Sequence, residues 1–163
     1  MIAAGGLYDG RGLAAALAFG AQGVWMGTRF IASTEAHAAQ MYHDAILAST
    51  DEETIRTRCY SGKPMRVRKN GYVDDWERRP QEIQPFPMQA ALSVRNGVIG
   101  GIGGQMEGLD MDRSCFAMGQ SAGGVRDVKP AGEIVADIMR EAHASIARMA
   151  ALSARSPAAV AAE

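Results

Sequence analysis

The chain has 163 residues, 47% of them hydrophobic, which is enough for one buried core. Its 17 basic and 18 acidic residues leave a net charge of −1, so overall charge attracts neither nucleic acid nor an anionic membrane surface. No apolar run approaches the roughly 18 residues of a membrane span, and the N-terminus lacks the basic start of a signal peptide, so we expect a cytoplasmic protein.

The first 27 residues have the pattern of a strand, a helix and a second strand. Residues 2–4 are a short apolar run that stops at Gly5-Gly6, as a buried parallel strand stops at its carboxyl end. Asp9 can cap a helix over residues 12–19, and residues 23–27 form a second short apolar run. Together these segments predict a βαβ unit with a right-handed crossover.

The start of the chain suggests a larger parent fold. Residues 2–4 resemble a barrel strand whose first residue is replaced by a start methionine, and a domain rarely begins on its ligand-binding strand. A complete (β/α)8 barrel takes about 250 residues, more than this chain has. We therefore expect an α/β fold that forms a partial (β/α)8 TIM barrel, containing the last two strands and a mostly helical C-terminal extension.

A longer helix is predicted over residues 35–49 from apolar residues at three- and four-residue steps. His37 and His43 would lie six residues apart on it and point to different sides, which predicts surface or helix-edge histidines and no shared metal site. Cys59 and Cys115 are distant, without CxxC spacing, and are expected to be free thiols. No metal site is predicted.

The middle of the chain is predicted to be irregular. Thr50 and Glu53 have the spacing of a capping box, which predicts a brief helix over residues 51–58. Residues 59–87 contain turn signals and prolines, and are expected to form an excursion with little core of its own. Within it, residues 65–68 alternate like an exposed strand.

The C-terminal part is predicted to be mostly helical. Its expected segments are a short helix at 88–95, a glycine-rich stretch at 97–104, a helix at 110–118, a glycine-containing break at 119–124, and a helix from Lys129-Pro130 to about residue 152. We assign residues 1–152 to one domain, the C-terminal part of a barrel, and residues 153–163 to a frayed tail.

Two strand ends carry the strongest indication of function. A phosphate needs several main-chain N–H donors that converge on it, and side chains must be absent for the backbone to approach. Gly5, Gly6 and Gly27 remove those side chains at the ends of the two predicted strands, and the Thr28 hydroxyl adds a donor. Since barrels often bind phosphate on the loops after their last strands, this βαβ unit predicts a phosphate site.

The same residues carry a resemblance to a known family. Several segments resemble nitronate monooxygenases, also called 2-nitropropane dioxygenases, and the related flavin-dependent enoyl-acyl-carrier-protein reductases. These segments are Ala3 to Leu7 with Asp9 to Gly12, Gly23 to Phe30, Met118 to Gly123, and Lys129 to Val135. The resemblance covers most of residues 2–142 and implies FMN, held non-covalently by its phosphate. The cofactor-binding residues that it implies are Gly5, Gly6, Trp25, Met26, Gly27, Thr28, Gln120 and Ser121.

The catalytic base is not assigned. In the family it is a histidine that precedes the segment matched here, and His37, His43 and His143 do not correspond to it. These three histidines are expected to be helix residues outside the flavin motifs. The catalytic residue of this chain is therefore unknown, and a proton-transfer group would have to come from elsewhere.

Three functions remain open at this point. The resemblance implies FMN-dependent oxidation of alkyl nitronates, with this chain as the C-terminal part of the enzyme. A flavin-dependent enoyl or acyl-thioester reductase or dehydrogenase is the alternative, so the small-molecule partner is a nitronate or an acyl substrate. The third is a catalytically silent truncated fragment, which could pair with a separately encoded N-terminal half and would be inactive alone.

Overall fold

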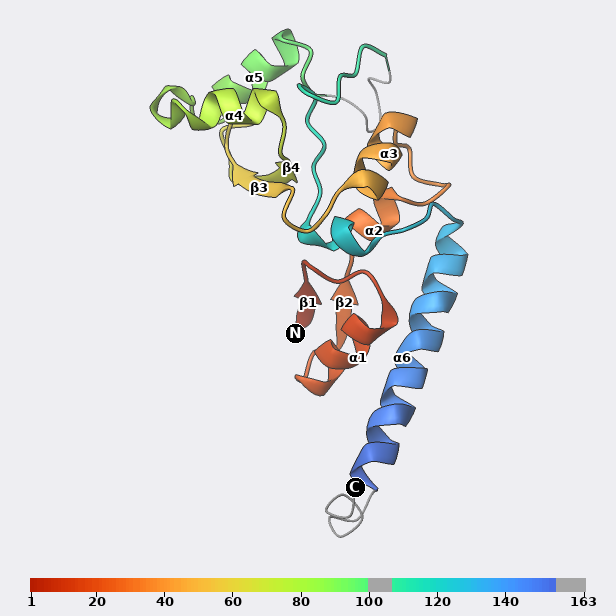
Figure 1. Cartoon of the computed structure of the whole chain (residues 1–163). Coiled ribbons are helices and arrows are strands. Elements are labelled where there is room, and N and C mark those ends of the chain that lie inside the picture. Colours follow the sequence, from red (N-terminus) through yellow and green to blue (C-terminus); the bar gives the residue numbers. More distant parts are fainter. Residues whose placement is uncertain (100–106, 155–163) are drawn as a thin grey trace.

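The computed structural model describes residues 1–99 and 107–154 and has a mixed α/β fold with a helical C-terminal part (Figure 1). In chain order the elements are β1 (Ile2–Ala4), α1 (Gly10–Ala18), β2 (Gly23–Trp25), α2 (Thr28–Ile31), α3 (Gln40–Ala48), β3 (Thr54–Thr57), β4 (Met65–Arg68), α4 (Gly71–Glu77), η1 (Pro80–Glu82), α5 (Met88–Arg95), η2 (Gln120–Gly124) and α6 (Ala131–Ser153). None of the helices within the described ranges is both long enough and apolar enough to cross a bilayer. Most of the predicted glycine-rich stretch at 97–104, and of the predicted tail, lies outside these ranges.

The predicted βαβ unit is confirmed at the N-terminus. β1 and β2 pair in parallel, with Ala3 opposite Val24 and Ala4 opposite Trp25. Helix α1 connects them, and its first turn is capped by Asp9, whose Oδ1 accepts a hydrogen bond from the Gly12 N–H at 2.9 Å. The carboxyl ends of both strands therefore meet at one edge.

The long helix α6 covers one side of this unit (Figure 1). Ile134, Ile138 and Ala142 form an apolar stripe on α6 and are buried against Leu13 and Ala14 of α1. The two helices approach closely at Gly10, where an added Cβ would lie 2.2 Å from the Ile138 carbonyl oxygen. Glycine is required there because any side chain would push α6 away from α1.

A second core joins α3 to distant parts of the chain. Tyr42 and Ile46 of α3 are fully buried against Phe116, and the cluster also contains Met118 and Val125. The ring centroids of Tyr42 and Phe116 lie 5.2 Å apart in a tilted arrangement. This core holds residues 116–125 over the carboxyl ends of the parallel strands.

The middle of the chain has a core of its own, so the prediction of an excursion with little core is wrong. Its buried residues are Cys59, Tyr60, Val67, Val73, Trp76, Val98 and Cys115. The Tyr60 and Tyr72 rings stack at 5.1 Å. Val98 and Cys115 are contributed from outside the predicted excursion, which is why that segment alone looked too polar to pack. Burial raises the pKa of the Cys59 thiol to about 11 and that of Cys115 to about 12.

The predicted helix at residues 51–58 is also wrong, because Thr54–Thr57 form β3, antiparallel to β4. The capping contact exists, since the Thr50 N–H donates to the Glu53 carboxylate at 2.8 Å, but a helix does not follow. Three of the four β3 residues are β-branched and favour a strand once β4 offers a partner. β4 occupies the predicted residues 65–68, although its Val67 is fully buried.

Residues 110–118 were predicted to be helical and are not. Their main chain instead pairs with β4: the Arg68 N–H donates to the Phe116 carbonyl, and the Met118 N–H donates to the Arg66 carbonyl. An isolated bridge links Val67 to Ala117. Residues 110–114 keep a single turn, in which the Ser114 N–H donates to the Asp110 carbonyl, and hydrogen bonds to a distant strand replace helical ones only at residues 116–118.

The helix predicted over 35–49 is shorter, since α3 begins at Gln40. His37 therefore lies before the helix and is exposed, whereas His43 on α3 is buried, with no partner for its Nε2 in the described structure. The prediction of surface or helix-edge histidines is wrong for His43. Residues 34–36 form turns, which leave the Glu35 carboxylate free to bind α6.

Candidate functional site

The carboxyl ends of β1 and β2 lie at one edge of the parallel pair, and both are followed by glycine. Gly5 and Gly6 adopt φ values of 89° and 72°, in the left-handed region where a side chain would be strained. Gly27 directly precedes α2 and follows β2 by two residues. The chain can make these turns without placing a side chain over the edge.

The space beside these three glycines is open. An added Cβ would meet no atom within 4 Å at Gly5, Gly6 or Gly27. By contrast, a Cβ at Gly124 would lie 2.0 Å from the Tyr8 ring, so that glycine serves packing. The strand-end glycines thus leave room for a ligand to approach the main chain, as phosphate binding requires.

Thr28 links this edge to a segment far along the chain. Its side chain is buried, and its Oγ1 accepts a hydrogen bond from the Gly119 N–H at 2.9 Å. A hydroxyl that accepts one bond still has its own hydrogen to donate. Thr28 can therefore hold residue 119 and donate to a bound anion at the same time.

Gln120 and Ser121, predicted from the resemblance to touch a cofactor, follow this contact directly. An added Cβ at Gly119 would lie 3.5 Å from Ser121 Oγ and 3.6 Å from Thr28 Oγ1, so both hydroxyls flank that residue. Ser121 is buried and Gln120 is exposed. The structure brings Thr28 and Ser121 together across 93 positions of the sequence.

Trp25 and Met26 point in different directions. The Trp25 side chain is 73% exposed, whereas Met26 packs with Phe30 against the core between α1 and α6. A ligand at the strand edge could contact the Trp25 ring. The Met26 side chain is turned into the core, so only the main chain of Met26 could contact that ligand. Successive strand side chains alternate in this way between the two faces of a sheet.

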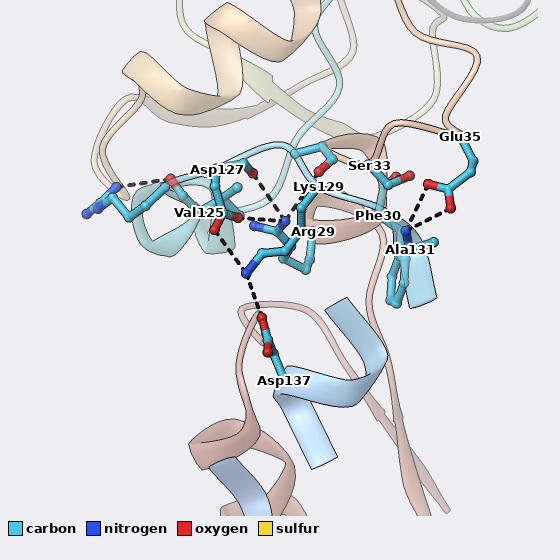
Figure 2. Close-up of polar contacts among 11 residues, drawn as sticks. Arg29, Phe30, Ser33, Glu35, Val125, Asp127, Lys129, Ala131 and Asp137 are labelled. Carbon is cyan, nitrogen blue, oxygen red and sulfur yellow. Dashed lines mark hydrogen bonds and ion pairs between the residues drawn. The ribbon is translucent and has the colours of Figure 1, made fainter. Parts of the chain in front are cut away.

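An ionic network lies beside this edge and was missed by the sequence analysis (Figure 2). Arg29, only 6% exposed, pairs with the Asp127 carboxylate at 2.9 Å and donates to the Ala32 and Asp127 carbonyls. Lys129 bridges Asp127 and Asp137, at 3.0 and 2.6 Å. Asp127 lies 98 residues after Arg29, so the only signal in the sequence was an arginine directly after the phosphate motif.

Hydrogen bonds and charges within the network shift the pKa values of its members. Hydrogen bonds to Asp137 and then Asp127 raise the pKa of Lys129, and hydrogen bonds from Lys129 and Arg140 lower the pKa of Asp137. The Glu35 carboxylate accepts from the Ala131 N–H at the start of α6, at 2.8 Å, which lowers the pKa of Glu35 (Figure 2). Helix α6 is thus tied to the segment that follows α2.

The histidines are not gathered at this edge. His37 lines an apolar groove with Met26, Gly27 and Phe30, so it lies beside one of the flavin motifs in space although it is outside them in the sequence. His143 is exposed on α6. Among the described residues there is no cluster of three side chains suited to a metal ion.

Comparisons with solved structures agree on this architecture. FabK from Thermotoga maritima superposes with a TM-score of 0.75 and 35% identity, covering 93% of this chain and 46% of its own. The nitroalkane oxidase from Streptomyces ansochromogenes superposes with a TM-score of 0.75 and 24% identity, covering 91% of this chain and 40% of its own.

Sequence comparisons point the same way. "Putative monooxygenase Rv1533" of Mycobacterium tuberculosis is 35% identical over 144 residues, which are 86% of this chain and 38% of that protein. "Probable nitronate monooxygenase" of Staphylococcus saprophyticus is 41% identical over 93 residues, 57% of this chain and 26% of that protein. The chain therefore spans less than half the length of these relatives. The sequence profile described as nitronate monooxygenase matches residues 1–141.

Proposed function

Because this chain belongs to the nitronate monooxygenase family, whose members are flavin-dependent oxidoreductases, we propose that it supplies the phosphate-binding part of an FMN site. The observation that carries the proposal is the open space at Gly5, Gly6 and Gly27, at one edge of a parallel strand pair and beside the Thr28 hydroxyl. These residues suit a phosphate because main-chain N–H groups become accessible and no side chain blocks them.

In this proposal β1 and β2 are the last two strands of a (β/α)8 barrel, and α6 follows as a C-terminal extension. Two features support it: the strands are parallel and joined by a helix, and FabK superposes over 93% of the chain. The remaining barrel strands would be supplied by a partner segment, such as a separately encoded N-terminal half. They would cover the exposed side chains of Ile2 and Trp25.

The chain's own residues bind and orient the cofactor rather than carry out chemistry. Bound FMN would supply the redox step, accepting electrons from the substrate. The strand-end main chain would hold the phosphate, Thr28 would donate a hydrogen bond to it, and Gln120 and Ser121 would lie beside it. The substrate proposed first is an alkyl nitronate, and the acid/base group is assigned to the partner segment.

The likeness to FabK, an enoyl-acyl-carrier-protein reductase, favours a second candidate, a flavin-dependent reductase of acyl thioesters. FabK is 35% identical and nitroalkane oxidase 24%, at the same TM-score. The two candidates share the phosphate site proposed here and differ in the substrate pocket. Oxygen uptake with propyl nitronate, against reduction of a crotonyl thioester, distinguishes them once the partner segment is present.

The phosphate site itself is tested by comparing FMN with riboflavin, which lacks the phosphate. We expect the chain to bind FMN more tightly than riboflavin in a fluorescence titration, and Gly27→Val to abolish that preference by filling the space beside the main chain. Gly132→Val is the matched control, because its Cβ also enters open space but lies at the start of α6. An unchanged preference in Gly27→Val would rule out this site.

A further inference from the structure

Two consecutive residues of α2 bind the two ends of one distant segment. Thr28 Oγ1 accepts from the Gly119 N–H at 2.9 Å, at the start of residues 119–127. Arg29 binds the other end, pairing with the Asp127 carboxylate at 2.9 Å and donating to its carbonyl at 3.1 Å. The segment that carries Gln120 and Ser121 is therefore attached to α2 at both ends.

The attachment through Arg29 involves a buried charge. Arg29 is only 6% exposed, and a buried charge requires a partner. Asp127 is that partner, and it is itself half exposed. Arg29 has no other carboxylate partner among the described residues, since its further bonds go to the carbonyls of Ala32 and Asp127.

The pair is also connected to the long C-terminal helix. Lys129 binds the same Asp127 carboxylate at 3.0 Å and reaches Asp137 of α6 at 2.6 Å (Figure 2). Charges of alternating sign thus run from α2 through residue 127 to α6. A shift of residue 127 would disturb both the segment after η2 and the anchoring of α6.

We propose that Arg29 and Asp127 are positioning residues, whose ion pair holds residues 119–127 against α2 so that Gly119 and Ser121 stay beside Thr28. The ligand that benefits is a flavin phosphate, so this part of the inference rests on the proposed function. Arg29 and Asp127 act through Thr28 and Gly119. The ion pair therefore governs how well the edge is formed, independently of whether a ligand is present.

The first test needs no ligand. Hydrogen exchange of the Gly119 N–H reports whether that amide stays bonded to Thr28. In Asp127→Asn we expect it to exchange about tenfold faster than in the wild type, with recovery in Asp127→Glu. Arg78→Gln, which breaks the exposed ion pair with Asp75, is the control and should leave the rate unchanged. A Gly119 rate in Asp127→Asn within twofold of the wild type would overturn the proposal.

The second test uses the ligand. The preference for FMN over riboflavin should fall about tenfold in Asp127→Asn and stay unchanged in Arg78→Gln. If Gly119 exchanges faster in Asp127→Asn but the wild-type chain shows no preference for FMN, the positioning role is upheld and the phosphate site is rejected. A preference for FMN that Asp127→Asn leaves intact would reject the positioning role alone.

Folding of the variant is checked separately by its thermal transition. If Asp127→Asn unfolds below the assay temperature, Arg29→Gln replaces it, because it removes the buried charge itself and leaves Asp127 half exposed and paired with Lys129. We then expect about tenfold faster exchange at Gly119, as for Asp127→Asn. An unchanged rate in Arg29→Gln would likewise overturn the proposal.

Discussion

At the scale of single residues, the glycines of this chain serve two opposite purposes. At Gly10 and Gly124 neighbouring atoms occupy the space that a side chain would need, so these glycines allow α6 and the Tyr8 ring to approach the main chain. Gly5 and Gly27 face open space at the strand edge, where the main chain is accessible. Only the second kind can admit a ligand, which explains why we assign the phosphate to that edge.

Thr28 offers a test at this scale. Thr28→Val keeps the shape of the side chain and removes both the acceptor for Gly119 and the donor for a phosphate. We expect FMN to bind about tenfold more weakly, the loss typical of one hydrogen bond to a charged group. Thr28→Ser retains the hydroxyl and should bind FMN nearly as well as the wild type. Equal affinities for all three forms, measured by flavin fluorescence, would show that the hydroxyl does not contact the phosphate.

At the scale of elements, helix α6 depends on contacts outside itself. Pro130 cannot cap it with a side chain, and the first free N–H, that of Ala131, is bound by Glu35 from 96 residues away. Asp137 in its second turn is held by Lys129 and Arg140. The start of α6 is thus fixed by carboxylates that must be ionised.

This arrangement predicts how the helix responds to acid. The pKa of Glu35 is lowered by the Ala131 N–H, and that of Asp137 by Lys129 and Arg140. Both groups therefore contribute stability that is fully present above their unfolded pKa values of 4.5 and 3.8, and that is lost as the pH falls through the lower folded values. We expect the amides at the start of α6 to lose protection below about pH 4. Glu35→Gln should flatten that dependence, and an identical acid profile in the variant would contradict the assignment.

At the scale of the whole molecule, the parallel pair leaves apolar side chains in solvent. Ile2 and Trp25 are more than half exposed on the two strands, and Phe19 is 88% exposed at the end of α1. Strands of this kind are normally covered by neighbours on both edges. The exposed surface is therefore where a partner segment would pack.

That surface can be detected in the isolated chain. We expect it to bind a hydrophobic dye and to self-associate in size-exclusion chromatography, because soluble monomers rarely expose contiguous apolar surface. Trp25→Lys should reduce dye binding, while Val94→Lys on the distant helix α5 should reduce it less. A monomeric chain that does not bind the dye would show that the strands form a self-contained domain.

The proposal that other barrel strands come from a partner segment also predicts the activity of the chain alone. We expect oxygen uptake with propyl nitronate and added FMN to be no faster than with free FMN, since loss of a positioned acid/base group costs about two to four orders of magnitude in rate. A phosphate site without a pocket for the flavin ring also leaves most of the cofactor in water. Turnover clearly above the free-flavin rate would show that His37, or another residue of this chain, supplies the missing group.

Several features could be read from the sequence because they depend on nearby residues. The βαβ unit follows from apolar runs that end at Gly5-Gly6 and Gly27, and the cap at Asp9 and the stripe of α6 have local spacing. The family follows from the same motifs. The fold class was confirmed as mixed α/β, while the partial barrel, the domain limits and the cofactor residues remain predictions.

What only the tertiary structure decided is which distant partners each residue meets. Residues 54–57 and 110–118 had helical patterns, yet residues 54–57 became a strand and residues 116–118 became extended because β4 offered their main chains hydrogen bonds. The core of residues 59–87 depends on Val98 and Cys115, and the pairing of Arg29 with Asp127 spans 98 positions. Local pattern determines helices and turns through contacts of a few residues. Cores, ion pairs and the assembled strand edge depend on long-range contacts that no spacing in the sequence records.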